Sequence, residues 1–351
     1  MSLTRRRRRT TIGDVARLAG VSNGAVSLAL SGKAGVADTT RGRIIAAADE
    51  LGWHPNIGAR ALLSSRAFAV GLLIARDAEL LGADPFFPAF IAGIEMELSG
   101  RGYALVLQVV RNDAIGEDDA YRRLAQEGRV DGVFLTDLRD GDRRIALVEE
   151  LALPAIAVGE PSGRTSIPWV AINHVAGVRQ AVSHLLSLGY RRIAFVGGTP
   201  GYVHSATRLA AWRHTLERAD VSPGPDISGD FTGAGGAVAT ARLLGAPDRP
   251  TAIVFANDLM AIAGMSVAAQ MGIDIPRDLS VVGFDDIPLA AHVNPPLTTI
   301  RQDVVSWGRA SAAALLSLID EQEPALVELP PAELVVRAST ASPSGHGRRA
   351  G

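Results

Sequence analysis

Three short segments near the N-terminus carry apolar residues at the spacing of an α-helix. Val15, Leu18 and Ala19 mark the first, and Thr11 with Asp14 three residues later can cap its start. The apolar positions of the other two segments are Ala25, Val26, Ala29 and Leu30, then Ile44, Ile45, Ala48 and Leu51. Short helices separated by glycine-containing turns predict a helix-turn-helix unit, whose braced middle helix can enter a DNA major groove. A generic three-helix bundle is the competing interpretation.

Beyond residue 68 the pattern changes to short apolar runs that alternate with helical stretches. The runs predict strands at residues 69–74, 104–110, 132–135, 155–158, 170–172, 193–196, 253–255 and 280–284. The stretches predict helices at residues 88–99, 118–127, 143–151, 175–188, 207–219, 234–244 and 259–271. Such alternation is typical of parallel sheets covered by helices. The segment is too long for one sheet, so we expect two lobes with a ligand cleft between them.

Composition narrows the class of protein further. The chain of 351 residues has no cysteine, which excludes disulfides, thiolate nucleophiles and cysteine-based metal sites. No apolar run reaches the roughly 18 residues of a membrane span. The arginine run at residues 5–9 precedes no apolar core and no cleavage site, which argues against a secretion signal. We therefore expect a cytoplasmic protein without a membrane partner.

Charge is distributed unevenly along the chain. Residues 1–66 hold 11 basic and 4 acidic side chains, a net charge of +7, whereas the whole chain has a net charge of −2. The remainder is therefore acidic, at −9. A compact basic head on an acidic body indicates a polyanionic partner for the head alone.

A set of motifs runs in order through nearly the whole chain. The N-terminal part contains TIGDVARLAGVS (11–22), AVS (25–27), TR (40–41) and LGWHPN (51–56). The remainder contains DPFF (84–87), HLLSLGYRRIAFVGG (184–198), RLA (208–210), FAND (255–258), VVGFDD (281–286) and PPLTTI (295–300). This ordered set resembles the LacI/GalR family of transcriptional regulators, named after lac repressor.

The resemblance implies an α/β protein in which a three-helix helix-turn-helix head precedes a two-lobed core like that of periplasmic binding proteins. With the apolar pattern, it predicts a head at residues 1–55, a hinge helix or linker at 56–67, a core at 68–340 and a disordered tail at 341–351. The first lobe is expected at residues 68–166 and 300–327, and the second at 167–299 and 328–340.

The resemblance also implies the partners. Members of this family bind a pseudo-palindromic operator in double-stranded DNA as homodimers, with the second helix of each head in a major groove. The linker forms a hinge helix that inserts a leucine, here Leu62, into the minor groove, where an apolar wedge kinks the duplex. A small-molecule effector closes the lobes and changes the affinity for DNA.

The candidate DNA contacts are Thr11, Ser22, Asn23, Gly24, Ser27, Thr40, Asn56, Ala59, Arg60 and Leu62. The hydroxyl side chains suit phosphate contacts, and those that cap a helix do so at an N-terminus that favours anions. Gly24 has no side chain with which to read a base, and Leu28 stands where the family often has arginine. Asn23 is then the main polar reader, suited to adenine.

The candidate effector contacts are Phe86, Phe87, Arg208, Asn257, Asp285 and Gln302. Asn257 and Asp285 follow apolar strands, at the sheet edge where α/β proteins bind ligands. Phe86 or Phe87 can stack on the flat face of a ligand. The family uses the position of Arg208 to hold effector oxygens. Asp286 is interpreted as structural, and Trp169 and Trp212 as core residues.

Other function classes fit less well. A solute-binding protein for a transporter would lack the basic head. An enzyme acting on sugars or nucleotides would need a catalytic constellation, and neither a phosphate-binding loop nor a metal-ligand spacing is present. We expect no cofactor, no metal and no catalysis. A carbohydrate is the expected effector, with purines and other small molecules as alternatives, and the sequence leaves repression or activation, and induction or corepression, open.

Overall fold

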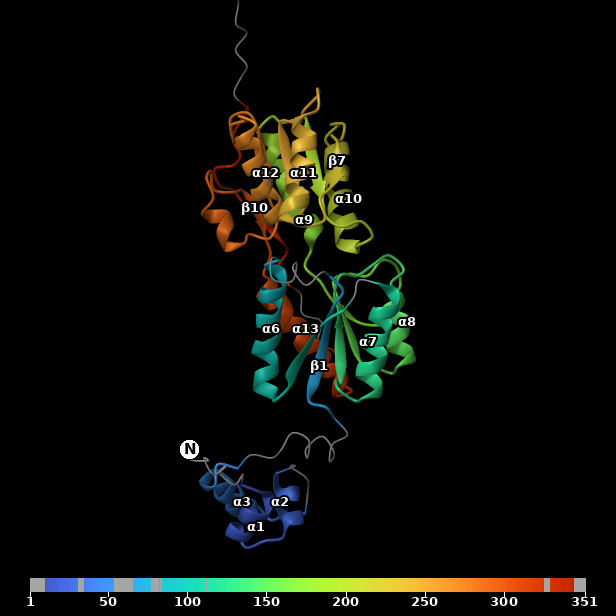
Figure 1. The fold of residues 1–351 in the computed structure, drawn as a ribbon, viewed down its shortest axis with the longest axis vertical. Coiled ribbons are helices and arrows are strands. Elements are labelled where there is room, and N and C mark those ends of the chain that lie inside the picture. Colours follow the sequence, from blue (N-terminus) through green and yellow to red (C-terminus); the bar gives the residue numbers. More distant parts are fainter. Residues whose placement is uncertain are drawn as a thin grey trace, which may run out of the picture. The chain divides into compact units, whose positions relative to one another are not determined.

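The computed structural model of the protein describes residues 10–30, 35–53, 66–76, 82, 84–110, 113–324 and 329–343. The chain divides into two compact units, Met1–Phe68 and Ala69–Gly351 (Figure 1). Each unit has a hydrophobic core of its own. We refer to the first unit as the head and to the second as the body.

The head consists of three helices around a small apolar core. They are α1 (Ile12–Ala19), α2 (Asn23–Leu30) and α3 (Asp38–Glu50). Val15, Val26 and Ile44, one from each helix, are fully buried against one another. This arrangement confirms the predicted three-helix head.

Polar contacts and one glycine fix where the first two helices begin and end. The Asp14 carboxylate accepts hydrogen bonds from the Thr11 backbone N–H at 3.0 Å and from the Thr11 hydroxyl at 2.7 Å. Gly20 ends α1 in the left-handed region at φ 66°, which costs a glycine little. Ser22 Oγ accepts a hydrogen bond from the Ala25 N–H at 3.2 Å and so caps α2.

The first lobe of the body is a parallel sheet with helices on both faces. Its strand order is β2 (Ala104–Val109), β1 (Ala69–Ile74), β3 (Gly132–Leu135), β4 (Ala155–Val158) and β5 (Trp169–Val170). The helices are α6 (Phe86–Arg101), α7 (Ala114–Gln126), α8 (Arg143–Glu150) and α13 (Val304–Ile319). In Figure 1, α6 and α13 cover one face and α7 and α8 the other.

The second lobe repeats this architecture with a smaller sheet. Its parallel strands are β7 (Asp226–Ser228), β6 (Ile193–Gly197), β8 (Ala252–Phe255) and β9 (Ser280–Val282), in that order. The helices are α9 (His174–Ser187), α10 (Val203–Glu217), α11 (Gly233–Leu244) and α12 (Asp258–Gln270), and a short 3-10 helix, η1, spans Pro288–Ala291. β10 (Thr299–Arg301) and β11 (Glu333–Val335) form an antiparallel pair.

The chain crosses between the lobes beside these sheets. β5 of the first lobe leads into α9 of the second, and β10 leads back into α13 of the first. We placed β5 in the second lobe, which is wrong, because it pairs in parallel with β4 through Ala157 and Trp169. A strand of two residues has too little alternation to assign from sequence.

The apolar pattern does not predict every helix and strand. The pattern does not predict α13, whose residues are buried on most sides, so that it lacks an amphipathic stripe. It also misses the three-residue strands β7, β10 and β11. The predicted tail begins too early, because the Ala341 carbonyl accepts a hydrogen bond from the Tyr190 hydroxyl at 2.8 Å. Residues 344–351 lie outside the described residues.

The packing of α6 on α13 depends on two glycines. A Cβ on Gly93 would overlap the carbonyl oxygen of Val305, and a Cβ on Gly308 would overlap that of Phe90. These close approaches let the two helices touch backbone to backbone, which joins the C-terminal crossover to the core of the first lobe.

We expect Gly93→Ala to destabilise the body by about 1–3 kcal/mol, because the helices must separate to admit the methyl group. Gly100→Ala, in the same helix with nothing within 4 Å of the new Cβ, is the matched control. It should be neutral or stabilise the body by up to about 1 kcal/mol. Chemical unfolding of the two variants measures their free energies of unfolding. Equal values would show that α6 and α13 can admit the methyl group without separating.

Candidate functional site

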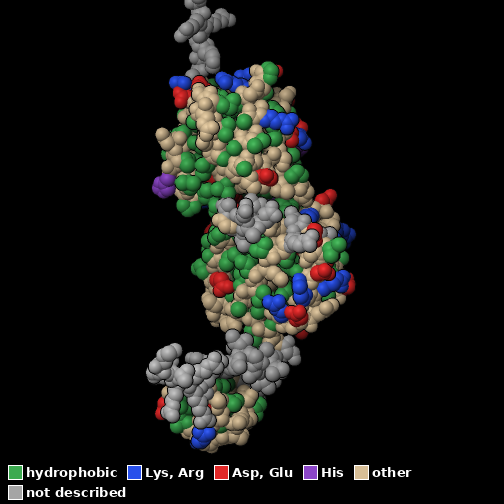
Figure 2. Space-filling model, in the orientation of Figure 1, with side chains coloured by type: hydrophobic (Ala, Val, Ile, Leu, Met, Phe, Trp, Pro, Cys, Tyr) green, Lys and Arg blue, Asp and Glu red, His purple; other side chains and the backbone are tan. Residues whose placement is uncertain are grey.

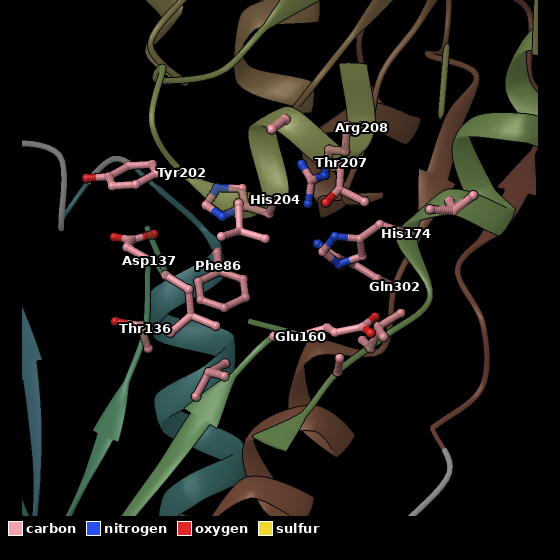
Figure 3. A pocket seen from close by; sticks show the side chains of 18 of the residues that line it. Phe86, Thr136, Asp137, Glu160, His174, Tyr202, His204, Thr207, Arg208 and Gln302 are labelled. Carbon is pink, nitrogen blue, oxygen red and sulfur yellow. The ribbon is translucent and has the colours of Figure 1, made fainter. Parts of the chain in front are cut away.

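A cavity of about 980 Å³ lies between the two lobes of the body (Figure 3). Its walls are formed by segments that follow the carboxyl ends of strands in both sheets. In Figure 3, Phe86, Thr136, Asp137 and Glu160 approach it from the first lobe, and Tyr202, His204, Thr207 and Arg208 from the second. The cavity therefore occupies the position that the strand pattern predicts for a ligand.

Five of the six residues predicted to contact an effector line this one cavity: Phe86, Arg208, Asn257, Asp285 and Gln302. Phe87 does not line it. The Phe87 ring is fully buried in the core, with the Arg76 guanidinium 5.1 Å from its centroid. Adjacent residues on a helix point about 100° apart, so only one of the two rings can face the cavity.

The Phe86 ring is held in place by other aromatic rings. It stacks on Phe90 at 5.5 Å between centroids and meets Trp307 edge to face at 5.7 Å. Trp307 is itself fixed by a hydrogen bond from its indole N–H to the Val170 carbonyl at 2.7 Å. Phe86 thus offers a rigid apolar surface to the cavity.

Asp285 and Gln302 form a hydrogen-bonded pair on the wall. Gln302 Nε2 donates to Asp285 Oδ1 at 2.6 Å, and the Asp285 N–H donates to the Ile300 carbonyl at 2.8 Å. Asp285 has a φ of 113°, a strained conformation for a residue with a side chain. Burial raises the pKa of Asp285 well above its usual range, although the charge of Arg208 opposes the shift.

Arg208 is a buried cation that forms no ion pair with a carboxylate among the described residues. Its guanidinium lies 3.7 Å from the centroid of the Phe284 ring, and Nη1 donates to the Ala256 carbonyl at 2.5 Å. Burial lowers the pKa of Arg208 to about 10, while the charge of Asp285 acts in the opposite direction. A ligand oxygen beside this group would regain part of the lost solvation.

Three polar atoms in this wall are buried and form no hydrogen bond within the described part of the chain: Arg208 Nε, His174 Nε2 and Gln302 Oε1. Native proteins satisfy nearly all such atoms, because an unpaired one costs about 1–3 kcal/mol. Their grouping around one cavity indicates a site for a ligand rich in hydroxyl groups or other polar atoms.

Asn257 is already engaged in the protein. Its Oδ1 accepts a hydrogen bond from the Met260 N–H at 3.0 Å and caps α12, and its Nδ2 donates to the Phe231 carbonyl at 2.9 Å. The side chain therefore fixes the start of a helix and a neighbouring loop at the wall of the cavity.

The first lobe contributes a charged cluster that the sequence reasoning missed. Arg76 Nη2 and Nε contact the Asp137 carboxylate at 2.6 and 2.7 Å, and Nη1 contacts Asp84 at 2.8 Å. Burial alone would raise the pKa of Asp137, but the charge and hydrogen bonds of Arg76 hold it below the usual value. Arg76 and Asp137 follow β1 and β3, so the strand-end rule applied to every strand would have found them.

Two histidines in the wall are neutral at physiological pH. Burial and then the charge of Arg208 lower the pKa of His204 to about 3 and that of His174 well below 6.5. A neutral imidazole can donate through one ring nitrogen and accept through the other, which suits a hydroxyl-bearing ligand.

Trp212, Trp169 and Asp286 lie in different surroundings. Trp212 is fully buried, as expected of a core residue, but Trp169 is 40% exposed and lines the cavity, so its assignment to the core is wrong. Asp286 is structural, because its carboxylate accepts from Arg301 Nε at 2.7 Å and from Arg337 Nη2 at 2.6 Å.

The head presents the start of α2 to solvent. Ser22, Asn23 and Gly24 are exposed there, as is Thr11 at the start of α1, whereas Ser27 and Thr40 are half-buried. The predicted linker contacts Asn56, Ala59, Arg60 and Leu62 lie outside the described residues.

On the body, by contrast, acidic and basic side chains are interspersed. The visible face in Figure 2 shows both signs together where α7 and α8 lie. Arg122 and Glu150 form an ion pair there at 2.8 Å. A surface of mixed sign gives no general attraction for a polyanion.

Comparison with known proteins assigns the family. A family model described as bacterial regulatory proteins, lacI family, matches residues 11–56, and a periplasmic binding protein-like domain matches residues 182–340. The HTH-type transcriptional regulator CelR of Thermobifida fusca is 35% identical over 318 residues, which are 90% of this chain and 93% of CelR. The chain belongs to the lacI family of bacterial regulatory proteins.

Solved structures of lacI family members have the same fold. A CelR–cellobiose complex matches 94% of this chain and all of its own with a TM-score of 0.71 and 33% identity. A lac repressor dimer bound to operator and the anti-inducer ONPF matches 95% of this chain and all of its own with a TM-score of 0.82 and 31% identity.

The family assignment fixes the function of this chain at a general level. Like its relatives, this lacI family member is a DNA-binding transcriptional regulator of the helix-turn-helix type. Among the residues described, no helix is both long and apolar enough to cross a lipid bilayer.

A buried carboxyl group next to the cavity gives a pH-dependent contribution to stability. Asp258 begins α12, where its carboxylate accepts from the Thr299 hydroxyl at 2.5 Å and from the Ile287 N–H at 2.9 Å. Burial raises its pKa from 3.8 to about 7, and these hydrogen bonds act in the opposite direction. Between these values the folded chain binds more protons than the unfolded chain, so the free energy of unfolding falls as pH rises.

We expect Asp258→Asn to remove this contribution. The stability of the variant relative to the original chain should therefore rise between about pH 5 and pH 8. Urea unfolding at the two pH values measures it, with Asp248→Asn, at an exposed aspartate, as the control. A pH-independent difference between Asp258→Asn and the original chain would mean that Asp258 is ionised throughout.

Proposed function

We propose that this chain binds a pseudo-palindromic operator as a homodimer and that a carbohydrate in the cavity between the lobes controls its affinity for DNA. The observation that carries the effector half is the group of buried, unpaired polar atoms beside the rigid Phe86 ring. A sugar ring has one apolar face and a rim of hydroxyl groups, which matches such a wall. Cellobiose in the complex of a relative supports this class of ligand.

Within the cavity we propose distinct roles for the wall residues. Asp285, Arg208 and Gln302 hydrogen-bond to neighbouring hydroxyl groups, and Phe86 stacks on the ring. Asn257 positions the wall, since both of its polar atoms already hold protein groups. Phe87 takes no part, because it is buried in the core.

On DNA, the proposed roles follow from exposure and charge. Asn23 and Gly24, exposed at the start of α2, face the bases in the major groove. The hydroxyl groups of Thr11, Ser22, Ser27 and Thr40 contact phosphates. In the linker, Asn56, Ala59 and Arg60 contact the DNA and Leu62 enters the minor groove; the family resemblance is the basis for these four residues.

Dimer formation has a candidate surface on the first lobe. β2 is an edge strand of its sheet, and Leu107 and Val109 on it are 43% and 41% exposed. Met96 on α6, which packs on β2, is also exposed. Apolar side chains on an open sheet edge favour pairing with a second copy, and a twofold dimer matches an operator with two half-sites. Such a regulator acts in the cytoplasm and needs no catalytic activity.

The DNA half of the proposal predicts salt-sensitive operator binding by the head. The net charge of +7 in residues 1–66 releases counterions from DNA on binding, so affinity should fall steeply as salt rises. Deletion of residues 1–66 should abolish binding and leave the body folded, because the body has its own core. Fluorescence anisotropy with operator fragments at several salt concentrations measures both. Unchanged affinity of the headless body would refute the assignment.

The effector half predicts a loss of affinity in Asp285→Ala. Removal of the carboxyl group should weaken effector binding by roughly 1–3 kcal/mol, about five-fold or more, because the effector loses a hydrogen bond and its own polar group is left unpaired in a buried site. DNA binding without effector should survive, because the head is untouched. Calorimetry on this variant and on Asp248→Ala, at an exposed aspartate outside the cavity, provides the comparison. Unchanged effector affinity would remove Asp285 from the site, and loss of effector-free DNA binding would give it a role in the fold.

A further inference from the structure

The cavity continues beyond the wall formed by Arg208 and Asp285. Side chains alternate along the segment from β5 to the start of α9. Val170, Ile172 and His174 are buried, whereas Trp169 and Asn173 are exposed. Both sets border the cavity, since His174, Ile172, Trp169 and Asn173 all line it. The space therefore extends to both sides of this segment, with an inner part at His174 and an outer part at Trp169.

The outer part combines apolar surface with charged side chains. Trp169 is 40% exposed and Val175 is 44% exposed, so both present apolar surface where they line the cavity. Glu160, which follows β4, and Arg179 on α9 also line the cavity and are exposed. Among the described residues neither side chain has an ion-pair partner, so their polar atoms are available to a ligand.

We propose that this outer part is a second sugar subsite in which the indole of Trp169 stacks on a ring and Glu160 and Arg179 hydrogen-bond to its hydroxyl groups. The inference rests on the carbohydrate effector proposed above and assigns its size: the effector has at least two linked rings. The first ring lies against Phe86 in the inner part and the second against Trp169.

The inner and outer parts of the cavity both offer an apolar platform and polar side chains, the two kinds of surface that a sugar ring contacts. Phe86 in one part and Trp169 in the other offer an aromatic ring as a platform, and charged and amide side chains line the cavity around them. The total volume of about 980 Å³ is near the upper end of small-molecule pockets, more than a single ring needs. Trp169 lines this concave space, and β5, on which it lies, pairs with β4, which fixes the backbone at the platform.

The test compares matched monosaccharides and disaccharides on the full chain. The probes are glucose with cellobiose, glucose with maltose, and galactose with lactose, each titrated by calorimetry. For the pair that binds, the disaccharide should bind more tightly. Trp169→Ala should lower its affinity about five-fold, the scale of one aromatic contact, and leave the monosaccharide affinity unchanged. Trp169→Phe, which keeps a ring, should retain most of the disaccharide affinity.

Tryptophan fluorescence provides a measurement whose response to the ligand would be absent if Trp169 had only a structural role. The chain has four tryptophans: Trp212 and Trp307 are buried, Trp53 in the head is half-buried, and Trp169 is exposed. Acrylamide should therefore quench Trp169 strongly. The disaccharide should protect the original chain from quenching, and the monosaccharide should protect it much less. Trp169→Phe should lose this ligand-dependent protection.

The outcomes separate the subsite from the function on which it rests. If a monosaccharide and its disaccharide bind equally well and Trp169→Ala changes neither, the outer subsite is refuted while the carbohydrate effector stands. If Trp169→Ala weakens both sugars equally, Trp169 supports the fold of the wall and the subsite is again refuted. If none of these sugars binds the full chain, the carbohydrate assignment falls, and the subsite with it.

Discussion

The common direction of the strands is the constraint on which the site depends. In a parallel sheet every carboxyl end lies at the same edge, so residues distant in sequence meet there. In this protein Asp137 follows β3, Asn257 follows β8 and Asp285 follows β9, and all three border one cavity. The crossovers keep the carboxyl edges of both sheets facing that space. The close packing of α6 on α13 fixes the crossover that leads into α13.

The two walls differ in how far protein groups neutralise their buried charges. In the first lobe, Arg76 forms short ion pairs with both Asp137 and Asp84, so this buried cation is neutralised within the protein. In the second lobe, Arg208 contacts the Ala256 carbonyl and the Phe284 ring, and Asp285 accepts a hydrogen bond from the Gln302 amide. Burial without full compensation costs free energy. A ligand that pairs with these buried groups would recover that free energy, so we expect most of its polar contacts on the second lobe.

Sequence reasoning found the fold class and most of the inner wall, and its errors have physical causes. The strand-end rule located Asn257 and Asp285 because it depends only on an apolar run and the residue after it. The choice between Phe86 and Phe87 depends on the rotational phase of α6, which is set by packing on α13. Trp169 was misjudged because its exposure depends on the pairing of a two-residue strand with β4, a tertiary contact that no local pattern records.

Control of DNA affinity requires that the effector distinguish two arrangements of the lobes, since a ligand shifts an equilibrium only by its differential affinity. The lobes touch directly at one edge of the cavity, where the Val203 N–H donates to the Leu138 carbonyl at 2.8 Å and Arg139 forms a β-bridge with Tyr202. A ligand that contacts Phe86 on one wall and Arg208 on the other adds its free energy only when both walls are at this separation. Binding of a ligand that spans both walls would therefore depend on how the lobes are arranged.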